Sequence, residues 1–408
     1  MRIVVCTLGG EDRLWELPAS RLVSRTWIHG GERSLYELAV AAAALGHDVE
    51  LRGEISELDL RELADAAGPL PAVRMEPRRP TADDVVIVPE GWTDPLQYAR
   101  LALSPGRAVL LLLAPPGLFG WPFLGGWSPL HPREASLDGV ARPESFRAMA
   151  ALGFELWADS PGLAEAARMA GVRCVDIGHG SPLGAPEPVE KTHEVAFVEA
   201  NRWADEARRV AAQLEVSPLV IPETRHADLG RELSRARILI WPSRIEGRAR
   251  IPGEARAAGT VPVALRSNRF AESLGEDRGT VVVDSLEDMP GAVAALLSSP
   301  GRLERLAASG LRTAREENAW DRFMKRVDEA LSELPPPDPG REARATIGKD
   351  LAELLRHSDE ELEGAREAAM EAVRAFQALR QRGSVRWALR TAQLTRPWFA
   401  LKERLRGR

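Results

Sequence analysis

Short apolar runs alternate with stretches of helical periodicity along the first 180 residues of the chain. Residues 3–7, 48–52 and 108–113 have the length and composition of buried parallel strands. Between the first two runs, the alanine-rich stretch 33–45 predicts a helix that ends at Gly46. The same pattern predicts strands at 85–88, 156–158 and 173–176, and a helix over 162–170. This alternation is typical of a parallel α/β sheet.

The pattern starts again after a stretch with three prolines at 181–189. Strands are predicted at 194–198, 219–221, 238–241, 261–265 and 280–283, and helices at 205–214, 229–235, 253–258, 289–297 and 317–334. Two consecutive blocks of this kind indicate two Rossmann-like domains that face each other across a cleft. We expect them at 1–185 and 190–334, with ligands bound where the strands end and the helices begin.

A proline-rich linker at 335–341 separates these blocks from a helical extension at 342–408, because proline removes an amide donor and clashes with the preceding turn. Residues 341–381 carry one apolar stripe at helical spacing. The pattern leaves two roles open for 342–381: an arm packed on the body, or a short coiled coil that forms a homodimer.

Charge is distributed unevenly along the chain. The net charge is −6, yet residues 380–408 carry +8, which leaves −14 for the rest. An acidic body argues against nucleic acid as the partner of the whole molecule. In the basic tail, arginines alternate with Trp387, Trp398 and Phe399. The tail therefore either lies on an anionic membrane surface or packs as a helix on the acidic body.

Other sequence signals point to the cytoplasm. The chain has two cysteines, too few for a disulfide framework or a structural zinc site. Its first residues lack a secretory signal, and apolar runs such as 108–114 are far shorter than the ~20 residues of a membrane span. The histidines show no metal-ligand spacing. We expect a cytoplasmic protein, at most peripheral to the inner face of the membrane, with no metal site.

The candidate chemistry lies at 241–264, where a predicted strand runs into a loop that carries Glu246. Eight positions later Glu254 opens the next predicted helix, after Pro252-Gly253. Backbone amides at such a helix start can bind a diphosphate. The two carboxylates can accept hydrogen bonds from sugar and ribose hydroxyls, while Arg248 and Arg250 can add charge to the phosphates.

These residues resemble family 4 of the retaining glycosyltransferases with the GT-B fold. The likeness rests on Pro-Ser-Arg-x-Glu-Gly at 242–247 and Glu-Ala-x-Ala-x-Gly-x-x-Pro-Val at 254–263. It continues through Glu272 to Asn-Ala-Trp at 318–320. Upstream, Gly-Gly-Glu-Arg at 30–33 resembles the glycine-rich acceptor loop of that family.

The resemblance implies transfer of a sugar from a nucleotide-sugar donor with retention of anomeric configuration, a hexosyltransferase type of reaction without a metal or other cofactor. Glu246 would bind the donor sugar and Glu254 the nucleotide ribose, as the catalytic pair. The donor would also contact Arg202, Arg244, Gly247, Arg248 and Gly253. Gly30, Gly31, Glu32 and Arg33 would line the cleft on the acceptor side. The acceptor would be a glycan, lipid-linked or small-molecule substrate, as in polysaccharide biosynthesis.

The chain departs from the family pattern at three places. No histidine follows the buried strand that ends at Leu113, where the family often has one. No lysine follows Arg202, although Arg208 or Arg209 could substitute. The loop usually written Gly-Phe-Gly-Leu-Pro reads Gly-Arg-Ala-Arg-Ile-Pro at 247–252. A catalytically inactive GT-B scaffold that acts through its C-terminal helix is therefore the alternative. A GT-B epimerase or phosphorylase is a weaker alternative, and the phosphorylase is disfavoured further because no pyridoxal-lysine segment is evident.

Overall fold

The computed structural model describes residues 1–7, 20–23, 30–90, 101, 106–113, 143–183, 186–187, 189–199, 203–244, 250–266 and 274–336. They belong to one compact unit, Met1–Thr346. The predicted linker end, the helical extension 342–408 and the basic tail lie outside these residues, so those predictions stay untested.

The first sheet has seven parallel strands in the order β5-β3-β1-β6-β7-β8-β9. Its members are β1 (Arg2–Cys6), β3 (Asp48–Arg52), β5 (Ala72–Val73), β6 (Asp84–Pro89), β7 (Arg107–Leu112), β8 (Glu155–Ala158) and β9 (Cys174–Asp176). Two further short strands, β2 (Arg21–Val23) and β4 (Glu54–Ser56), pair with each other. The sequence predicts the long central strands to within a residue or two and misses β2, β4 and β5.

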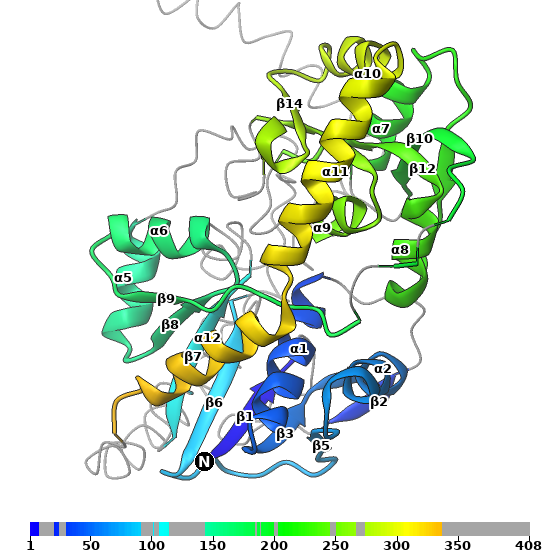
Figure 1. The fold of residues 1–408 in the computed structure, drawn as a ribbon. Coiled ribbons are helices and arrows are strands. Elements are labelled where there is room, and N and C mark those ends of the chain that lie inside the picture. Colours follow the sequence, from blue (N-terminus) through cyan, green and yellow to red (C-terminus); the bar gives the residue numbers. More distant parts are fainter. Residues whose placement is uncertain are drawn as a thin grey trace, which may run out of the picture. The chain divides into compact units, whose positions relative to one another are not determined.

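Helices cover both faces of this sheet, as Figure 1 shows. Side chains alternate along β1: Ile3 and Val5 enter the core with α1 (Gly30–Ala44) and α2 (Glu57–Ala67), whereas Val4 and Cys6 enter the core with α5 (Pro143–Ala151) and α6 (Pro161–Met169). Burial on both faces explains why these strands read as continuous apolar runs.

The second sheet has five parallel strands in the order β11-β10-β12-β13-β14. They are β10 (His193–Val198), β11 (Leu219–Ile221), β12 (Ala236–Trp241), β13 (Val261–Leu265) and β14 (Val281–Val283). One face packs on α7 (Ala204–Ala211), α10 (Met289–Leu297) and α11 (Pro300–Glu317), and the other on α8 (His226–Ser234) and α9 (Arg250–Ala257). The sequence predicts all five strands and misses α11. Each sheet with the helices packed on it forms one lobe of the unit.

The last described helix, α12 (Trp320–Ser332), belongs to the first core. Its apolar residues Phe323, Val327 and Leu331 pack in the cluster that also contains α1 and α2. The sequence pattern groups this segment with the second block, because it comes after that block along the chain. An amphipathic helix packs wherever a matching apolar surface lies, and here that surface is α1. The limits 185, 190 and 334 of the two domains stay predictions.

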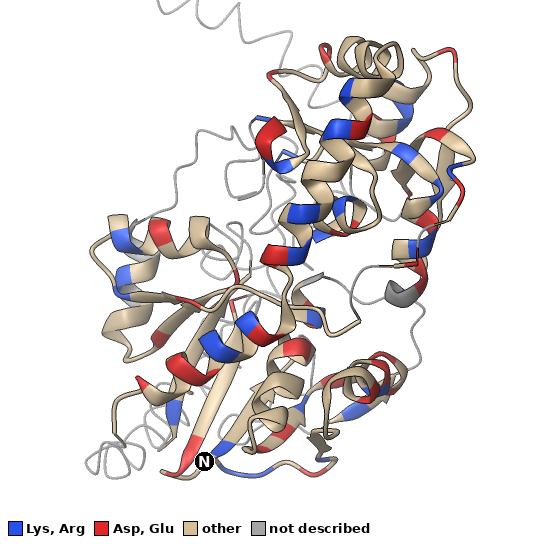
Figure 2. Cartoon of the chain, in the orientation of Figure 1, with Lys and Arg blue, Asp and Glu red and all other residues tan. Residues whose placement is uncertain are grey.

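Surface charge on the described helices is mixed. Figure 2 shows acidic and basic residues alternating along α11 and α12. Among the described residues, no helix has the length and apolarity that a bilayer span requires.

A tight turn next to α11 gives a first prediction. Gly279 comes after the turn η1 (Glu276–Arg278) at φ +77°, and a Cβ there would overlap the backbone of Gly310 in α11. Gly259 has a similar φ of +67° with nothing within 4 Å of such a Cβ. We expect Gly259→Ala to lower the free energy of unfolding by about 1 kcal/mol, for backbone strain alone. Gly279→Ala should cost at least about 2 kcal/mol more, for the clash.

Denaturant unfolding of both variants measures this difference, because the left-handed strain is matched between them. An equal loss in the two variants would contradict close packing of the η1 turn on α11.

Candidate active site

Part of the predicted site lies outside the described residues. Glu246, Gly247, Arg248 and Arg202 fall in segments for which no structure is described. Arg244, Gly253, Glu254 and the segment 30–33 are described. The geometry of the predicted site is therefore described only at this second group and at the residues around it.

The segment Gly30–Arg33 is not a loop, as the sequence pattern suggests, but the first turn of α1. Glycine is disfavoured in helix interiors, which is why the predicted helix starts only at Arg33. At Gly31, however, an added Cβ would lie 3.2 Å from Cδ1 of Leu113, just after β7. Glycine thus lets the start of α1 approach the carboxyl end of a central strand, the edge at which ligands bind in such sheets.

Helix α9 also begins earlier than expected. It starts at Arg250, three residues before Gly253, so Glu254 lies in its second turn and does not open it. Pro252 falls in the first turn, where its missing amide hydrogen costs nothing. Arg250 and Glu254 are four residues apart and therefore share one face of α9.

The Arg250 side chain joins α9 to α1. Its two terminal nitrogens donate to the two oxygens of Glu37 at 2.8 and 3.0 Å, and Nη1 also donates to Oγ of Ser34 at 2.9 Å. Ser34 in turn donates to Oδ2 of Asp159, after β8, at 3.3 Å. Burial lowers the pKa of Arg250, whereas the nearby Glu37 and Glu254 carboxylates raise it. The effect of the carboxylates is larger, so the pKa of Arg250 is raised overall. The terminal nitrogens of Arg250 are therefore hydrogen-bonded to α1 and are not directed to a phosphate, which differs from the expectation from the sequence.

Glu37 also binds a second arginine. Nε of Arg33 donates to Oε1 of Glu37 at 3.0 Å, with both side chains almost fully buried. A single carboxylate thus serves two guanidinium groups, one from each lobe. Glu37 is absent from the predicted site, although a carboxylate inside the apolar run of α1 is a signal of a buried ionic contact.

Arg244 connects the carboxyl ends of two strands in the second sheet. It lies just after β12, and its guanidinium lies 5.5 Å from the ring centre of Trp203, at the start of α7 after β10. This cation–π contact holds Arg244 near the strand ends where a donor would bind.

The two candidate substitutes for the missing lysine are engaged elsewhere. Arg208 pairs with Asp205 at 2.8 Å and with Glu199 at 3.2 Å, while Arg209 pairs with Glu206 at 3.4 Å. Each arginine is more than half exposed, so these pairs are weak. They nevertheless orient both side chains along α7.

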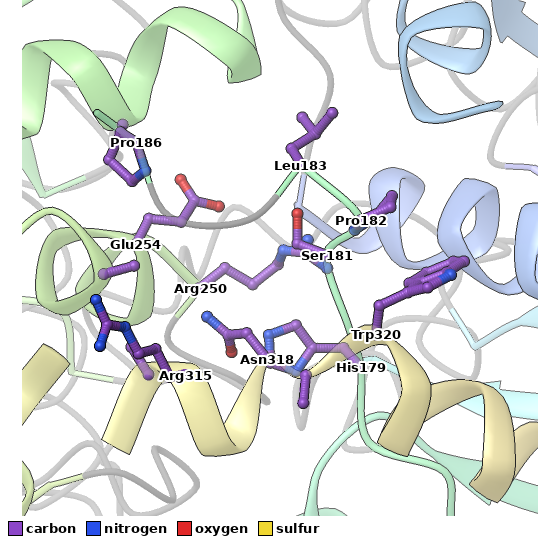
Figure 3. Close-up of a pocket in the computed structure, with 14 residues that line it drawn as sticks. His179, Ser181, Pro182, Leu183, Pro186, Arg250, Glu254, Arg315, Asn318 and Trp320 are labelled. Atoms are coloured by element: carbon purple, nitrogen blue, oxygen red, sulfur yellow. The ribbon is translucent and has the colours of Figure 1, made fainter. Parts of the chain in front are cut away.

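A cavity of about 380 Å³ lies beside Glu254. Figure 3 shows the Glu254 carboxylate and the Arg250 side chain directed into it. The other lining residues come from the segment 179–186, from α8 and α9, and from the end of α11 with the turn into α12: His179, Ser181, Pro182, Leu183, Pro186, Gly230, Ala257, Ala314, Arg315, Asn318, Ala319 and Trp320. In the sequence, Asn318 and Trp320 stand out only as part of the family likeness, and His179 reads as structural or exposed.

A buried ion pair fixes α9 at this cavity. Arg256, on α9, is 2% exposed and donates to Oε2 of Glu317, the last residue of α11, at 3.0 Å. The pair ties the helix that carries Glu254 to the helix that carries Arg315. Among the described residues, no group of three or more His, Cys, Asp or Glu side chains could hold a metal ion.

Comparisons with known proteins place the fold. No protein-family model matches the chain, and no curated protein matches it. Among solved structures, Anabaena Alr3699/HepE in complex with UDP-glucose matches with a TM-score of 0.56 and 13% identity, over 82% of this chain and 100% of that one. Sucrose-phosphate synthase from Thermosynechococcus elongatus matches with a TM-score of 0.56 and 12% identity, over 82% and 99%.

A glycosyltransferase from Rickettsia africae matches with a TM-score of 0.51 and 10% identity, over 82% and 99% of the two chains. At such identities the comparison shows the fold alone. The neighbours are GT-B glycosyltransferases, and the predicted GT-B architecture of two Rossmann-like domains is confirmed.

Proposed function

We propose that this chain is a retaining glycosyltransferase of the family 4 type that moves a sugar from a nucleotide-sugar to a glycan, lipid-linked or small-molecule acceptor. The observation that carries the proposal is the position of Glu254: on α9, directed into a cavity, in a GT-B fold. UDP-glucose in the similar HepE structure supports a nucleotide-sugar as the donor class.

In this proposal the two glutamates orient the donor. Glu254 accepts hydrogen bonds from the ribose and Glu246 from the sugar, while the first amides of α9 face the diphosphate. The acceptor hydroxyl attacks the anomeric carbon as the bond to the diphosphate breaks. The electron pair leaves with the diphosphate, whose oxygen takes the acceptor proton. The protein contributes orientation and charge stabilisation, and the proposal requires no metal.

Predictions for the rest of the chain accompany this proposal. Segment 380–408 would hold the enzyme at an anionic membrane surface on the cytoplasmic side, and 342–381 would pair two copies. Both segments lie outside the described residues.

Binding of nucleoside diphosphates to the full chain tests the donor site. We expect at least one of UDP, GDP, ADP and dTDP to bind in a calorimetric titration. Glu254→Gln should weaken that binding at least about tenfold, because a hydrogen bond to a charged acceptor becomes one to a neutral amide. The matched control is Glu304→Gln, on the exposed side of α11, and it should bind as the wild type does.

Two results would contradict the proposal. If no nucleotide binds, the GT-B scaffold alternative becomes the better explanation of the fold. If Glu254→Gln binds with unchanged affinity, the cavity beside Glu254 is not the donor site.

A further inference from the structure

Two helices begin at the junction between the lobes. Helix α1 starts at Gly30 and α9 at Arg250, and the Arg250 side chain reaches Ser34 and Glu37 in the first two turns of α1. Each helix start presents backbone amides without intrahelical acceptors and the positive end of a helix dipole. The junction is therefore electrostatically favourable for an anion before any side chain is considered.

Arg33 adds two buried hydrogen-bond donors to this junction that have no acceptor among the described residues. Its side chain is 1% exposed, and Nη1 and Nη2 have no hydrogen-bond partner among the residues that the structure describes. Burial is the main cause that lowers the pKa of Arg33, the Arg250 charge acts in the same direction, and Glu37 and Glu254 oppose both. Buried donors without acceptors are costly, and a phosphate would satisfy these two.

The Glu37 carboxylate does not fill that role in the described part of the chain, because it is bonded to Nε of Arg33 and not to the terminal nitrogens. Its Oε1 already accepts from Nε of Arg33 and from Arg250, and its Oε2 accepts from Arg250. The bond at Nε holds the Arg33 guanidinium by one edge and leaves the terminal nitrogens as a fork. Such a fork is matched to two oxygens of one phosphate.

We infer that Arg33 binds the diphosphate of the donor from the first lobe, opposite the start of α9. The inference rests on the proposed function and names a substrate-binding residue for it. The loop after β10 lacks the lysine of the family pattern. In this inference Arg33 on α1 supplies the missing positive charge. The diphosphate would then bridge the starts of both helices, so that donor binding joins the two lobes.

Affinities of Arg33→Gln for a nucleoside diphosphate and for the matching nucleoside test this role. The probe is whichever of UDP, GDP, ADP or dTDP binds the wild-type full chain. We expect Arg33→Gln to bind the diphosphate about 10- to 100-fold more weakly and the nucleoside with less than about a twofold change. Arg61→Gln, which removes the same charge from an exposed position on α2, should change neither affinity.

Thermal unfolding separates this role from a structural one. Glu37 keeps its two bonds to Arg250 in Arg33→Gln, so this variant without nucleotide should unfold within a few degrees of the wild type. The stabilisation that the diphosphate confers should shrink. Arg33→Lys keeps the charge but loses the fork and should bind with intermediate affinity, which provides a second readout if Arg33→Gln folds poorly.

The outcomes distinguish the two proposals. If the wild type binds a nucleoside diphosphate and both Arg33 variants bind it equally well, this inference is overturned while the proposed function stands. If the variants lose nucleoside and diphosphate affinity in equal measure, Arg33 does not contact the phosphates and the inference also fails. If the wild type binds no nucleoside diphosphate, both the proposed function and this inference are wrong.

Discussion

Replacing Glu246 by alanine should reduce turnover at least about 100-fold, the usual cost of removing a group that stabilises or orients the reacting centre. Glu246 lies four residues before α9, in the loop that the family likeness places at the donor sugar. Its carboxylate would orient the sugar at the anomeric carbon, where positive charge develops as the diphosphate departs. Binding of the nucleoside diphosphate alone, which has no sugar, should change much less.

Release of nucleoside diphosphate from candidate nucleotide-sugars measures this effect. Glu215→Ala, which removes a carboxylate from an exposed position after α7, serves as the control and should keep full turnover. Unchanged turnover in Glu246→Ala would contradict the assigned role. If no nucleotide-sugar is ever turned over, the scaffold alternative gains support.

Replacing Glu37 by glutamine should lower the free energy of unfolding by about 3–5 kcal/mol, because it leaves buried charge without its partner. Glu37 is fully buried and binds both Arg33 and Arg250, whose side chains are 1% and 9% exposed. Glutamine has nearly the same shape and removes the charge alone. The decrease in the free energy of unfolding should therefore measure the electrostatic contribution of the Glu37 carboxylate.

A matched pair on α2 controls for this effect. Glu57 also pairs with an arginine four residues away, Arg61, but both side chains are about half exposed or more. Glu57→Gln should cost less than about 0.5 kcal/mol. The double variant Glu37→Gln with Arg250→Gln should recover part of the loss, because one of the unpaired cations is then gone. Equal losses for Glu37→Gln and Glu57→Gln in denaturant unfolding would show that the junction is not held by this carboxylate.

The sequence predicts the central strands well because each is buried on both faces. Runs such as Asp48–Arg52 and Val261–Leu265 match β3 and β13 residue for residue. Short edge strands such as β5, which has two residues, are too short to show a strand pattern of apolar residues in the sequence. The sequence pattern does not predict helix α11, whose buried face includes Gly310 packed against Arg256. A glycine there suggests a break in the helix unless the partner side chain is known.

The candidate site could be predicted only where a motif marks it. The motif picks out Glu254, and the structure places that residue at a cavity. Local sequence does not reveal that Arg250 turns toward α1, because its partners Ser34 and Glu37 lie more than 200 residues away. The packing of α12 on α1 could not be predicted for the same reason. Contacts between distant segments depend on the packing of the whole unit.

Hydrogen–deuterium exchange of the full chain, with and without a saturating nucleoside diphosphate, tests the central claim most directly. We predict slower exchange at the starts of α1 and α9, in peptides covering residues 30–37 and 245–254, with little change along α2 and α10. Protection confined to other segments, from a nucleotide that binds, would contradict a donor site at this junction.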